Sequence, residues 1–240
     1  GFQSLGADEF KIGKPFVNMG HTFYISSTAI TSNGKYIISG SGDDTIKLWD
    51  IKTGRIIRTF IGHTDDVNSI AITADDKYII SGSSDNTIKL WDIETGKNVK
   101  DFLGHIDYVN TVSLSPNKKY LFSGSNDRTI KLWNIKTGKV LKTFKGHTGR
   151  VNAILATQDG KYLLSGSSDK TIKLWDIKTG KVLKTLKNSY SIDFIDISSD
   201  NKFVVYGSAS SRIKLWNIKA GRIVKTFKGH KKRVNSVLIS

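Results

Sequence analysis

Serine, histidine and aspartate recur together in this chain, and these residue types can form a nucleophile, a base and an orienting acid. His21, His63, His105 and His147 are each followed by a serine 18 residues later and by an aspartate 22 residues later. A hydrolytic site needs one such set, whereas four identical sets indicate a structural role. We therefore expect no catalytic residue and no enzyme in this chain.

The same spacing runs through the rest of the sequence. The tryptophans Trp49, Trp91, Trp133, Trp175 and Trp216 are 42, 42, 42 and 41 residues apart. A fixed period of about 40 residues is typical of a repeat architecture. Within the second unit, runs rich in Ile, Val, Thr and aromatic residues cover 67–72, 78–83, 87–92 and 98–102 and are separated by turn residues. Four antiparallel strands in each unit, stacked unit on unit, predict an all-β β-propeller.

Three motifs recur in the units: Gly-His near the start, Ser-Gly-Ser-x-Asp-x-Thr in the middle, and Ile-Lys-Leu-Trp followed by Asp or Asn at the end. On these motifs, which extend over essentially the whole chain, the protein resembles the WD-repeat family. The resemblance implies that the His, the first Ser, the Asp and the Trp of a unit form a hydrogen-bonded structural tetrad. An indole N–H needs an acceptor, and an imidazole can donate and accept in one chain of bonds. The implied tetrads are His21, Ser39, Asp43 and Trp49; His63, Ser81, Asp85 and Trp91; His105, Ser123, Asp127 and Trp133; and His147, Ser165, Asp169 and Trp175.

The repeats divide the chain as one WD-repeat β-propeller over residues 1–240. We expect five complete four-stranded antiparallel blades plus parts of a sixth from the two termini, in a protein that belongs to a longer chain or complex. Residues 10–17 resemble the end of a third strand and a fourth strand, and 234–239 have the pattern of an inner strand. The expected segments are a partial blade at 1–19, repeats at 20–61, 62–103, 104–145 and 146–187, a degenerate fifth repeat at 188–228, and the start of a sixth repeat at 229–240.

The fifth repeat departs from the motifs. Asn188 lies near the position of the histidine, Tyr206 stands at the serine position, and Ser210 stands at the aspartate position. Of the tetrad only Trp216 remains. Relaxed constraint on one blade would explain these changes, and so would a blade reshaped to bind a ligand.

Composition limits the other classes of function. The chain has no cysteine, so disulfides and cysteine metal sites are excluded. It has no phosphate-binding loop and no zinc-ligand cluster, and no run approaches the roughly 20 apolar residues that cross a bilayer. We expect no cofactor, no metal and no membrane contact. No signal segment opens the sequence, which favours a cytoplasmic location.

Charge distinguishes the two faces that the resemblance implies. Loops before the first strand and between the second and third strands would lie on the top face, where this family usually binds partner peptides. The top loops are nearly balanced in charge, whereas the bottom turns are predominantly basic, with lysines such as Lys136 and Lys178. The net charge of +16 favours contact with anionic surfaces.

We therefore expect a non-catalytic protein–protein interaction scaffold that binds a partner protein or peptide across the top face. The alternative is a nucleic-acid-associated or anionic-surface-binding module that uses the basic bottom face, with nucleic acid the less expected partner. The candidate partner-binding residues vary between units against a constant background. They are Tyr24, Asp66, Tyr108, Asn126, Arg128, Arg150 and Arg233.

Overall fold

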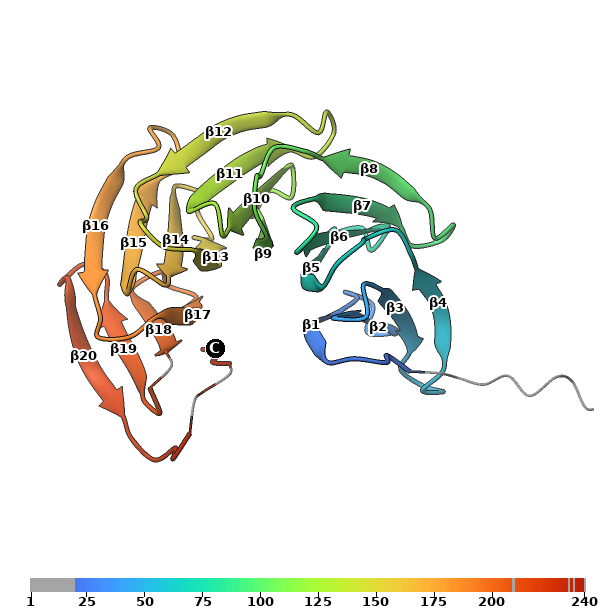
Figure 1. Ribbon diagram of the computed structural model, residues 1–240. Helices are drawn as coiled ribbons and strands as arrows, with labels where there is room; N and C mark the ends of the chain where they lie inside the picture. Colours follow the sequence, from blue (N-terminus) through green and yellow to red (C-terminus); the bar gives the residue numbers. More distant parts are fainter. Residues whose placement is uncertain (1–19, 209, 233, 235, 240) are drawn as a thin grey trace, which may run out of the picture.

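The computed structural model describes residues 20–208, 210–232, 234 and 236–239. These residues form strands and turns and contain no helix, so none of them belongs to a helix that could cross a membrane. The strands pair in five four-stranded antiparallel sheets, each in sequence order. Figure 1 shows the sheets as blades around an arc, with the first strand of each blade nearest the centre. The predicted all-β propeller of four-stranded blades is confirmed.

Each blade runs from an inner to an outer strand, and all strands have five or six residues. The bounds are, for blade 1, β1 Ile25–Ile30, β2 Tyr36–Ser41, β3 Ile46–Asp50 and β4 Ile56–Phe60; for blade 2, β5 Val67–Ile72, β6 Tyr78–Ser83, β7 Ile88–Asp92 and β8 Asn98–Phe102; for blade 3, β9 Val109–Leu114, β10 Tyr120–Ser125, β11 Thr129–Asn134 and β12 Val140–Lys145; for blade 4, β13 Val151–Ala156, β14 Tyr162–Ser167, β15 Thr171–Asp176 and β16 Val182–Lys187; and for blade 5, β17 Ile192–Ile197, β18 Phe203–Ser208, β19 Ile213–Asn217 and β20 Arg222–Phe227.

Turn chemistry explains why the strands end where they do. In blade 2, Asp76 and Asn86 adopt left-handed backbone conformations with φ of 53° and 69°, which Asp and Asn tolerate better than most residues. The aspartate after the tryptophan closes the last turn, because the Asp92 carboxylate accepts a 2.7 Å hydrogen bond from the backbone N–H of Thr95. The Trp-Asp motif therefore combines a core residue with a turn residue.

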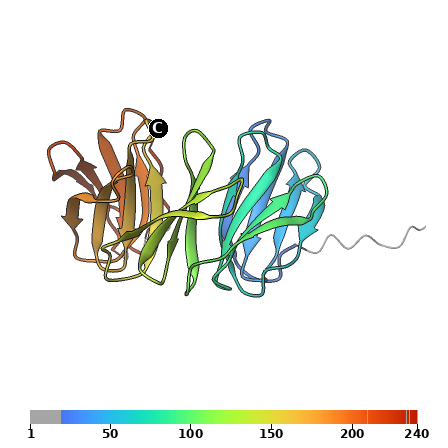
Figure 2. The ribbon, with the colours of Figure 1, turned by 90° about the horizontal axis from the view of Figure 1, so that it is seen from above.

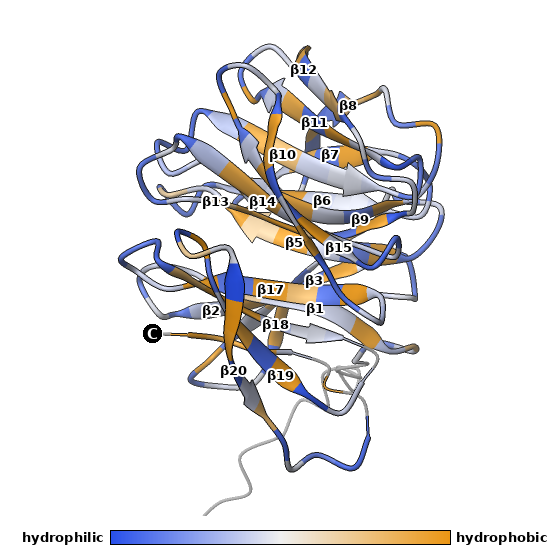
Figure 3. Ribbon diagram, turned by 90° about the vertical axis from the view of Figure 1, so that its left-hand side faces the viewer, coloured by the Kyte–Doolittle hydropathy of each residue, from blue (hydrophilic) through white to orange (hydrophobic). Residues whose placement is uncertain are grey.

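The hydrophobic core lies between blades. The cluster shared by blades 1 and 2 contains Ile46, Leu48 and Phe60 from one blade and Ile79 and Trp91 from the next. Equivalent clusters join blades 2 and 3, 3 and 4, and 4 and 5. Figure 3 shows hydrophobic colouring along the strands and hydrophilic colouring in the loops at their ends. Stability thus comes from stacking one blade on another, as expected for a repeat array.

Close contact between blades requires glycine in the second strand. A Cβ on Gly82 would lie 2.7 Å from Cγ1 of Val109 in the next blade. Such a separation is too short for two carbon atoms, so a larger residue would push the blades apart. The Ser-Gly-Ser motif therefore positions the first strand of the following blade.

Blades 1 and 5 stand at the two ends of the arc (Figure 1). Val67 and Val109 are fully buried against the preceding blade, whereas their counterpart Ile25 in blade 1 is 54% exposed. In the same way Phe60 is buried by the following blade, whereas Phe227 in blade 5 is 43% exposed. Each end of the arc therefore presents an exposed apolar face. In the interior blades the equivalent face is covered by the neighbouring blade.

The two predicted parts of a sixth blade compare differently with the structure. The partial blade predicted at 1–19 lies outside the described residues. The inner strand predicted at 234–239 is wrong for its described residues, none of which is assigned to a strand. An inner strand needs a second strand beside it, and the described residues offer none here. The segment nevertheless lies along blade 5, because Val234 is buried and the Ile239 N–H donates a 2.8 Å hydrogen bond to the Asp196 carboxylate.

Candidate functional site

The loops at one end of the blades carry the predicted site. Figure 2 shows the strands running between two sets of loops, one at each face of the arc. On the top face, the loop that enters a blade meets the loop between its second and third strands. The backbone N–H of Ser84 donates to the Asp66 carbonyl at 2.9 Å, and Asn126 donates to Tyr108 at 2.8 Å. These pairs of loops form the top surface of each blade.

Four side chains join these loops to the sheet in blade 2. The Trp91 indole N–H donates to Ser81 Oγ at 2.8 Å, and Ser81 Oγ lies 2.7 Å from His63 Nε2. His63 Nδ1 lies 2.7 Å from the Asp85 carboxylate, which also accepts from Thr87 Oγ1 at 2.6 Å. A neutral imidazole with its proton on Nδ1 satisfies every group in this chain of bonds.

The same arrangement recurs in blades 1, 3 and 4. The indole–serine, serine–imidazole and imidazole–carboxylate distances there lie between 2.6 and 2.9 Å. The structure thus brings together the side chains of each implied set. These are His21, Ser39, Asp43 and Trp49 in blade 1, His105, Ser123, Asp127 and Trp133 in blade 3, and His147, Ser165, Asp169 and Trp175 in blade 4.

The geometry of these sets is that of a structural support. Ser81 has no exposed surface, and its hydroxyl is committed to the indole on one side and the imidazole on the other. A nucleophile must reach a substrate, so this serine cannot act as one. The glycine before the histidine has a packing role, because a Cβ on Gly62 would lie 3.1 Å from the Trp91 ring.

Ionisation within the sets follows from burial and hydrogen bonding. Burial by itself would raise the pKa of Asp85, but the hydrogen bonds from His63 and Thr87 outweigh it and hold this pKa below the ordinary value. Burial lowers the pKa of His147, against the opposing effect of Asp169. Near neutral pH the aspartates are therefore ionised and His147 is neutral.

Blade 5 keeps the fold without these bonds. Tyr206 and Trp216 are each 1% exposed, and neither the Tyr206 hydroxyl nor the Trp216 indole N–H has a hydrogen-bond partner. A buried polar group without a partner costs roughly 1–3 kcal/mol. The Asn188 amide instead accepts a 2.7 Å hydrogen bond from Lys214 Nζ. The top of blade 5 is therefore built differently from the other four.

Two of the candidate binding residues lie in direct contact. The Tyr24 hydroxyl of blade 1 donates a hydrogen bond to the Asp66 carboxylate of blade 2. This bond, together with partial burial and the charges of Asp66 and Asp65, raises the pKa of Tyr24 to about 12. The pair joins the top loops of neighbouring blades.

The other candidates are spread over blades 3 and 4. Tyr108 is exposed, and its backbone is bonded to Asn126 in the opposing loop. Arg128 lies exposed in the β10–β11 turn with φ of 69°, and Arg150 Nε donates to Ser168 at 2.9 Å. Arg233 lies outside the described residues. The structure thus places the described candidates on one face, and only Tyr24 and Asp66 are joined by a side-chain bond.

The repeats of the chain match a known protein family. The family model for the WD domain, G-beta repeat, matches residues 13–50, 54–92, 96–134, 138–176 and 180–217, which is most of the chain. The chain belongs to the WD-repeat family. Each matched WD repeat from 54 onwards runs from the outermost strand of one blade to the third strand of the next, so the sequence unit links neighbouring blades.

Curated relatives match over short stretches. The ribosome biogenesis protein BOP1 homolog of Drosophila grimshawi is 46% identical over 50 residues, which cover 21% of this chain and 6% of that protein. The homolog of Drosophila ananassae is 51% identical over 43 residues, which cover 18% of this chain and 5% of that protein. A match of this length corresponds to about one WD repeat.

Sequence reasoning missed a group of exposed apolar side chains on the top face. Ile61 and Leu103 directly precede the Gly-His motif in the loops after β4 and β8, and they are 77% and 69% exposed. Ile106 is 85% exposed, two residues before the candidate Tyr108. The positions equivalent to Ile61 in blades 3 and 4 are lysines, so the change in residue type at one repeat position could have revealed this group.

Acidic side chains gather over the same blades. Carboxylate oxygens of Asp44, Asp65 and Asp66 all lie within 4.8 Å of one another, close enough to surround a cation. The aspartates of the tetrads are nearly buried and bonded, so they add little free charge to this surface. The top of this WD-repeat protein is therefore acidic and apolar over blades 1 and 2, and the exposed arginines Arg128, Arg150 and Arg212 lie over blades 3, 4 and 5.

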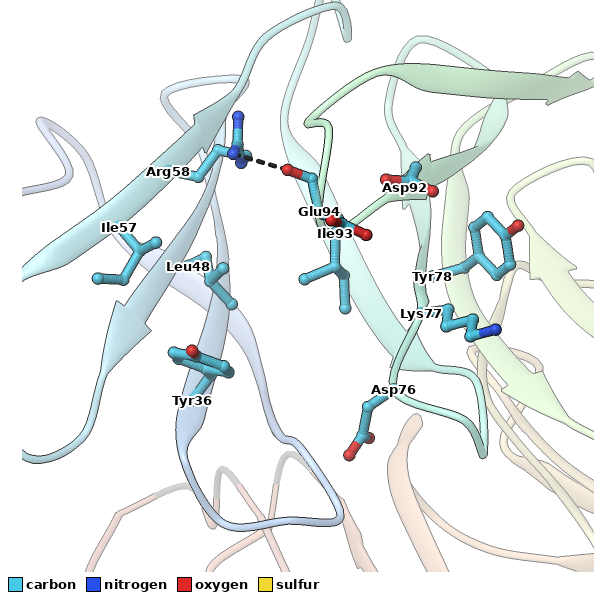
Figure 4. A pocket seen from close by; sticks show the side chains of 10 residues that line it. All are labelled: Tyr36, Leu48, Ile57, Arg58, Asp76, Lys77, Tyr78, Asp92, Ile93 and Glu94. Carbon is cyan, nitrogen blue, oxygen red and sulfur yellow. Dashed lines mark hydrogen bonds between the residues drawn. The ribbon is translucent and has the colours of Figure 1, made fainter.

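The bottom face contains a contact between blades that sequence reasoning also missed. Arg58 in β4 reaches over to the last turn of blade 2, where its Nη2 donates to the Glu94 carbonyl at 2.7 Å (Figure 4). Lys100, Lys142 and Lys184 stand at the equivalent position and donate to carbonyls of the following blade. The period of 42 residues among these basic residues was the available signal.

A hollow of about 530 Å³ opens beside Arg58, between blades 1 and 2 (Figure 4). Both signs of charge line it: Arg58 lies on the blade 1 side, and Lys77, Asp76, Asp92 and Glu94 lie on the blade 2 side. An anion entering this hollow would meet three carboxylates. The bottom face is therefore basic at its turns, whereas the hollow between blades 1 and 2 carries charges of both signs.

Proposed function

We propose that the chain is a non-catalytic scaffold that binds a partner protein or peptide across the top face of blades 1–3. The observation that supports this most is the group of exposed apolar and aromatic side chains there: Tyr24, Ile61, Leu103, Ile106 and Tyr108. Exposed apolar patches on soluble proteins commonly mark interaction sites.

The surrounding charges favour the same surface. Interfaces combine apolar and aromatic anchors with a polar rim, and Tyr is enriched among anchors. Asp44, Asp65 and Asp107 supply acidic groups in the same loops. WD-repeat proteins are generally scaffolds, which agrees with this assignment. The relatives are named for ribosome biogenesis, and their similarity to this chain spans about one repeat. This similarity supports a role in a complex, but it does not identify the partner.

Partner capture from a lysate tests the proposal, using three tagged forms of the chain after nuclease treatment at moderate salt. The first form is wild type, and the second carries Ile106→Asp and Tyr108→Ala. The third carries Leu141→Asp, which changes an exposed apolar residue on the outer strand of the same blade. We expect the double variant to capture about tenfold less, or lower still, of the partners that wild type captures. The loss of two anchors should reduce the free energy of binding by several kcal/mol. Leu141→Asp should capture them normally.

Equal capture by all three forms would contradict the proposal. Equal melting temperatures of the double variant and wild type would show that lost capture reflects the surface and not unfolding. These side chains are exposed, so neither substitution should change stability by more than about 0.5 kcal/mol.

A second candidate function uses the bottom face. Lysines at its turns, including Lys136 and Lys178, are exposed and could contact phosphates of a nucleic acid. Affinity for nucleic acid would then fall steeply with salt, and Lys136→Glu with Lys178→Glu would reduce it. Retention of partners after nuclease treatment favours the top-face scaffold over this alternative.

A further inference from the structure

The top of blade 5 contains a hollow of about 300 Å³. Its lining comes from the β16–β17 loop, the β18–β19 loop and the start of β19. In blades 1–4 the equivalent two loops carry the histidine and aspartate of the tetrad. The hollow therefore occupies the region that the tetrad fills elsewhere. The lining residues are Ser189, Tyr190, Ser210, Ser211, Arg212 and Lys214.

One lysine changes direction in this blade. Lys89 in blade 2 reaches outward to Asp101 on β8 at 3.0 Å, and Lys47 in blade 1 reaches Thr59 on β4 at 3.1 Å. Lys214 occupies the equivalent position in the third strand of blade 5, where it is paired with Tyr206 of the second strand. Its Nζ instead donates to Asn188 in the entering loop and lies along the hollow. The blade that lacks the histidine thus has an ammonium group at its top.

The hollow is lined by donors and positive charge. Arg212 and Lys214 supply two cations, the serines and Tyr190 supply hydroxyls, and the lining contains no carboxylate. Lys214 keeps N–H groups to spare, because an ammonium has three and Asn188 takes one. Arg212 is exposed and can orient its guanidinium toward an oxyanion.

Two further donors lie on the same face of the blade. Tyr206 and Lys214 are directly paired in the β18–β19 ladder, so their side chains project from the same side of the sheet, and Trp216 follows two residues later. The Tyr206 hydroxyl and the Trp216 indole N–H are fully buried and unpartnered. Neither side chain lines the hollow, but Tyr206 pairs with Lys214 and Trp216 lies two residues beyond it, so the Trp216 indole N–H can report on binding there.

We propose that this hollow binds a phosphoryl group carried by the partner peptide. The proposal rests on the proposed function, since it places the group on a partner that extends from the top face of blades 1–3 to the top of blade 5. A phosphoryl dianion offers three oxygens and a charge near −2. These match two cations and several hydroxyl donors better than the two oxygens and single charge of a carboxylate.

The site is tested first without any partner, by titrating inorganic phosphate into the ¹⁵N-labelled chain. The five tryptophan indole N–H resonances are followed by NMR, so that each blade carries its own reporter. We expect a saturable shift of the Trp216 resonance, with a dissociation constant on the order of 1 mM, while the other four stay in place. Arg212→Ala should weaken binding about tenfold or more, because it removes a charged donor.

Arg222→Ala is the matched control, since it removes an exposed arginine from β20 of the same blade. It should leave phosphate binding unchanged. No saturable shift at Trp216, or equal weakening by Arg222→Ala and Arg212→Ala, would overturn the site. A shift of all five resonances together would also overturn it, because that pattern indicates a general effect of charge.

A second arm identifies the source of the group. The probes are a short glycine peptide that carries one phosphoserine and the same peptide with serine. We expect the phosphopeptide to bind at least as tightly as inorganic phosphate and the serine peptide not to compete. If phosphate binds and the phosphopeptide does not, the assignment to a partner peptide is overturned. Neither arm uses Ile106 or Tyr108, so failure here is distinguishable from failure of the top-face scaffold.

Discussion

Blades 2 and 5 have the same four-stranded order and the same register between their second and third strands, yet their top loops are held differently. In blade 2 four side chains connect the loops to the sheet through Ser81 and His63. In blade 5 the equivalent tyrosine and tryptophan are buried without partners. The blade itself therefore depends on apolar packing against its neighbour, and the tetrad fixes the loops above it.

The largest effect should come from removing a tryptophan that has both roles. Trp91→Ala removes the side chain that packs on Phe60 and donates to Ser81, so we expect the free energy of unfolding to fall by about 3–5 kcal/mol. Trp216→Ala should cost about 1 kcal/mol less, because its indole N–H has no hydrogen bond to lose. Urea denaturation of both variants measures the difference. Equal losses would show that the tetrad bond adds nothing to packing.

A smaller effect isolates the hydrogen bonds. Ser81→Ala leaves the Trp91 indole N–H and His63 Nε2 without their partner, which should cost about 2–3 kcal/mol. The matched change in blade 5 is Tyr206→Phe, which deletes a hydroxyl that has no partner. We expect it to be neutral or to stabilise the chain by up to about 1 kcal/mol. Destabilisation by Tyr206→Phe comparable to that of Ser81→Ala would break the contrast between the blades.

The smallest effect concerns the stability of the chain as pH falls below about 6.5. Burial places the pKa of His147 below its unfolded value of 6.5, so its contribution to stability is complete above that pH and is lost as pH falls. The Asp85 carboxylate has a lowered pKa, and its contribution is present above 3.8 and lost as pH falls through the folded value. Thermal melting across this range should show the decline.

The variant His147→Gln provides the control for that prediction. It removes the titrating group, so the part of the decline that begins near pH 6.5 should become shallower. An unchanged pH profile in this variant would place the effect at another group. Blade 5 has no such histidine–aspartate pair and should contribute nothing to the part of the decline that begins near pH 6.5.

Much of the fold could be predicted from the sequence because the information is local and repeated. The strand ends in blade 2 follow from turn residues such as Asp76 and Asn86. The residues of each tetrad follow from motif spacing together with the family resemblance. The face that binds a partner followed from the family alone, and it is still a prediction.

The features that were missed depend on contacts between blades. Ile61 extends an apolar strand in the sequence and reads as a core residue unless it is compared with Lys145 and Lys187 at the equivalent position, yet it lies exposed on the top face. Ile25 resembles the buried Val67, yet it stands at the end of the arc. The direction of Lys214 depends on a partner, Asn188, that lies in another loop. No single segment of sequence contains this information.

The most direct test of the contrast between blades is hydrogen exchange at the five indole N–H groups, measured by NMR. We predict that Trp216 exchanges at least about tenfold faster than Trp91, Trp133 and Trp175, although all four are equally buried, because only Trp216 lacks an acceptor that resists local opening. Equal exchange rates for these four indoles would contradict the view that the tetrads hold blades 2–4 and that blade 5 has lost this support.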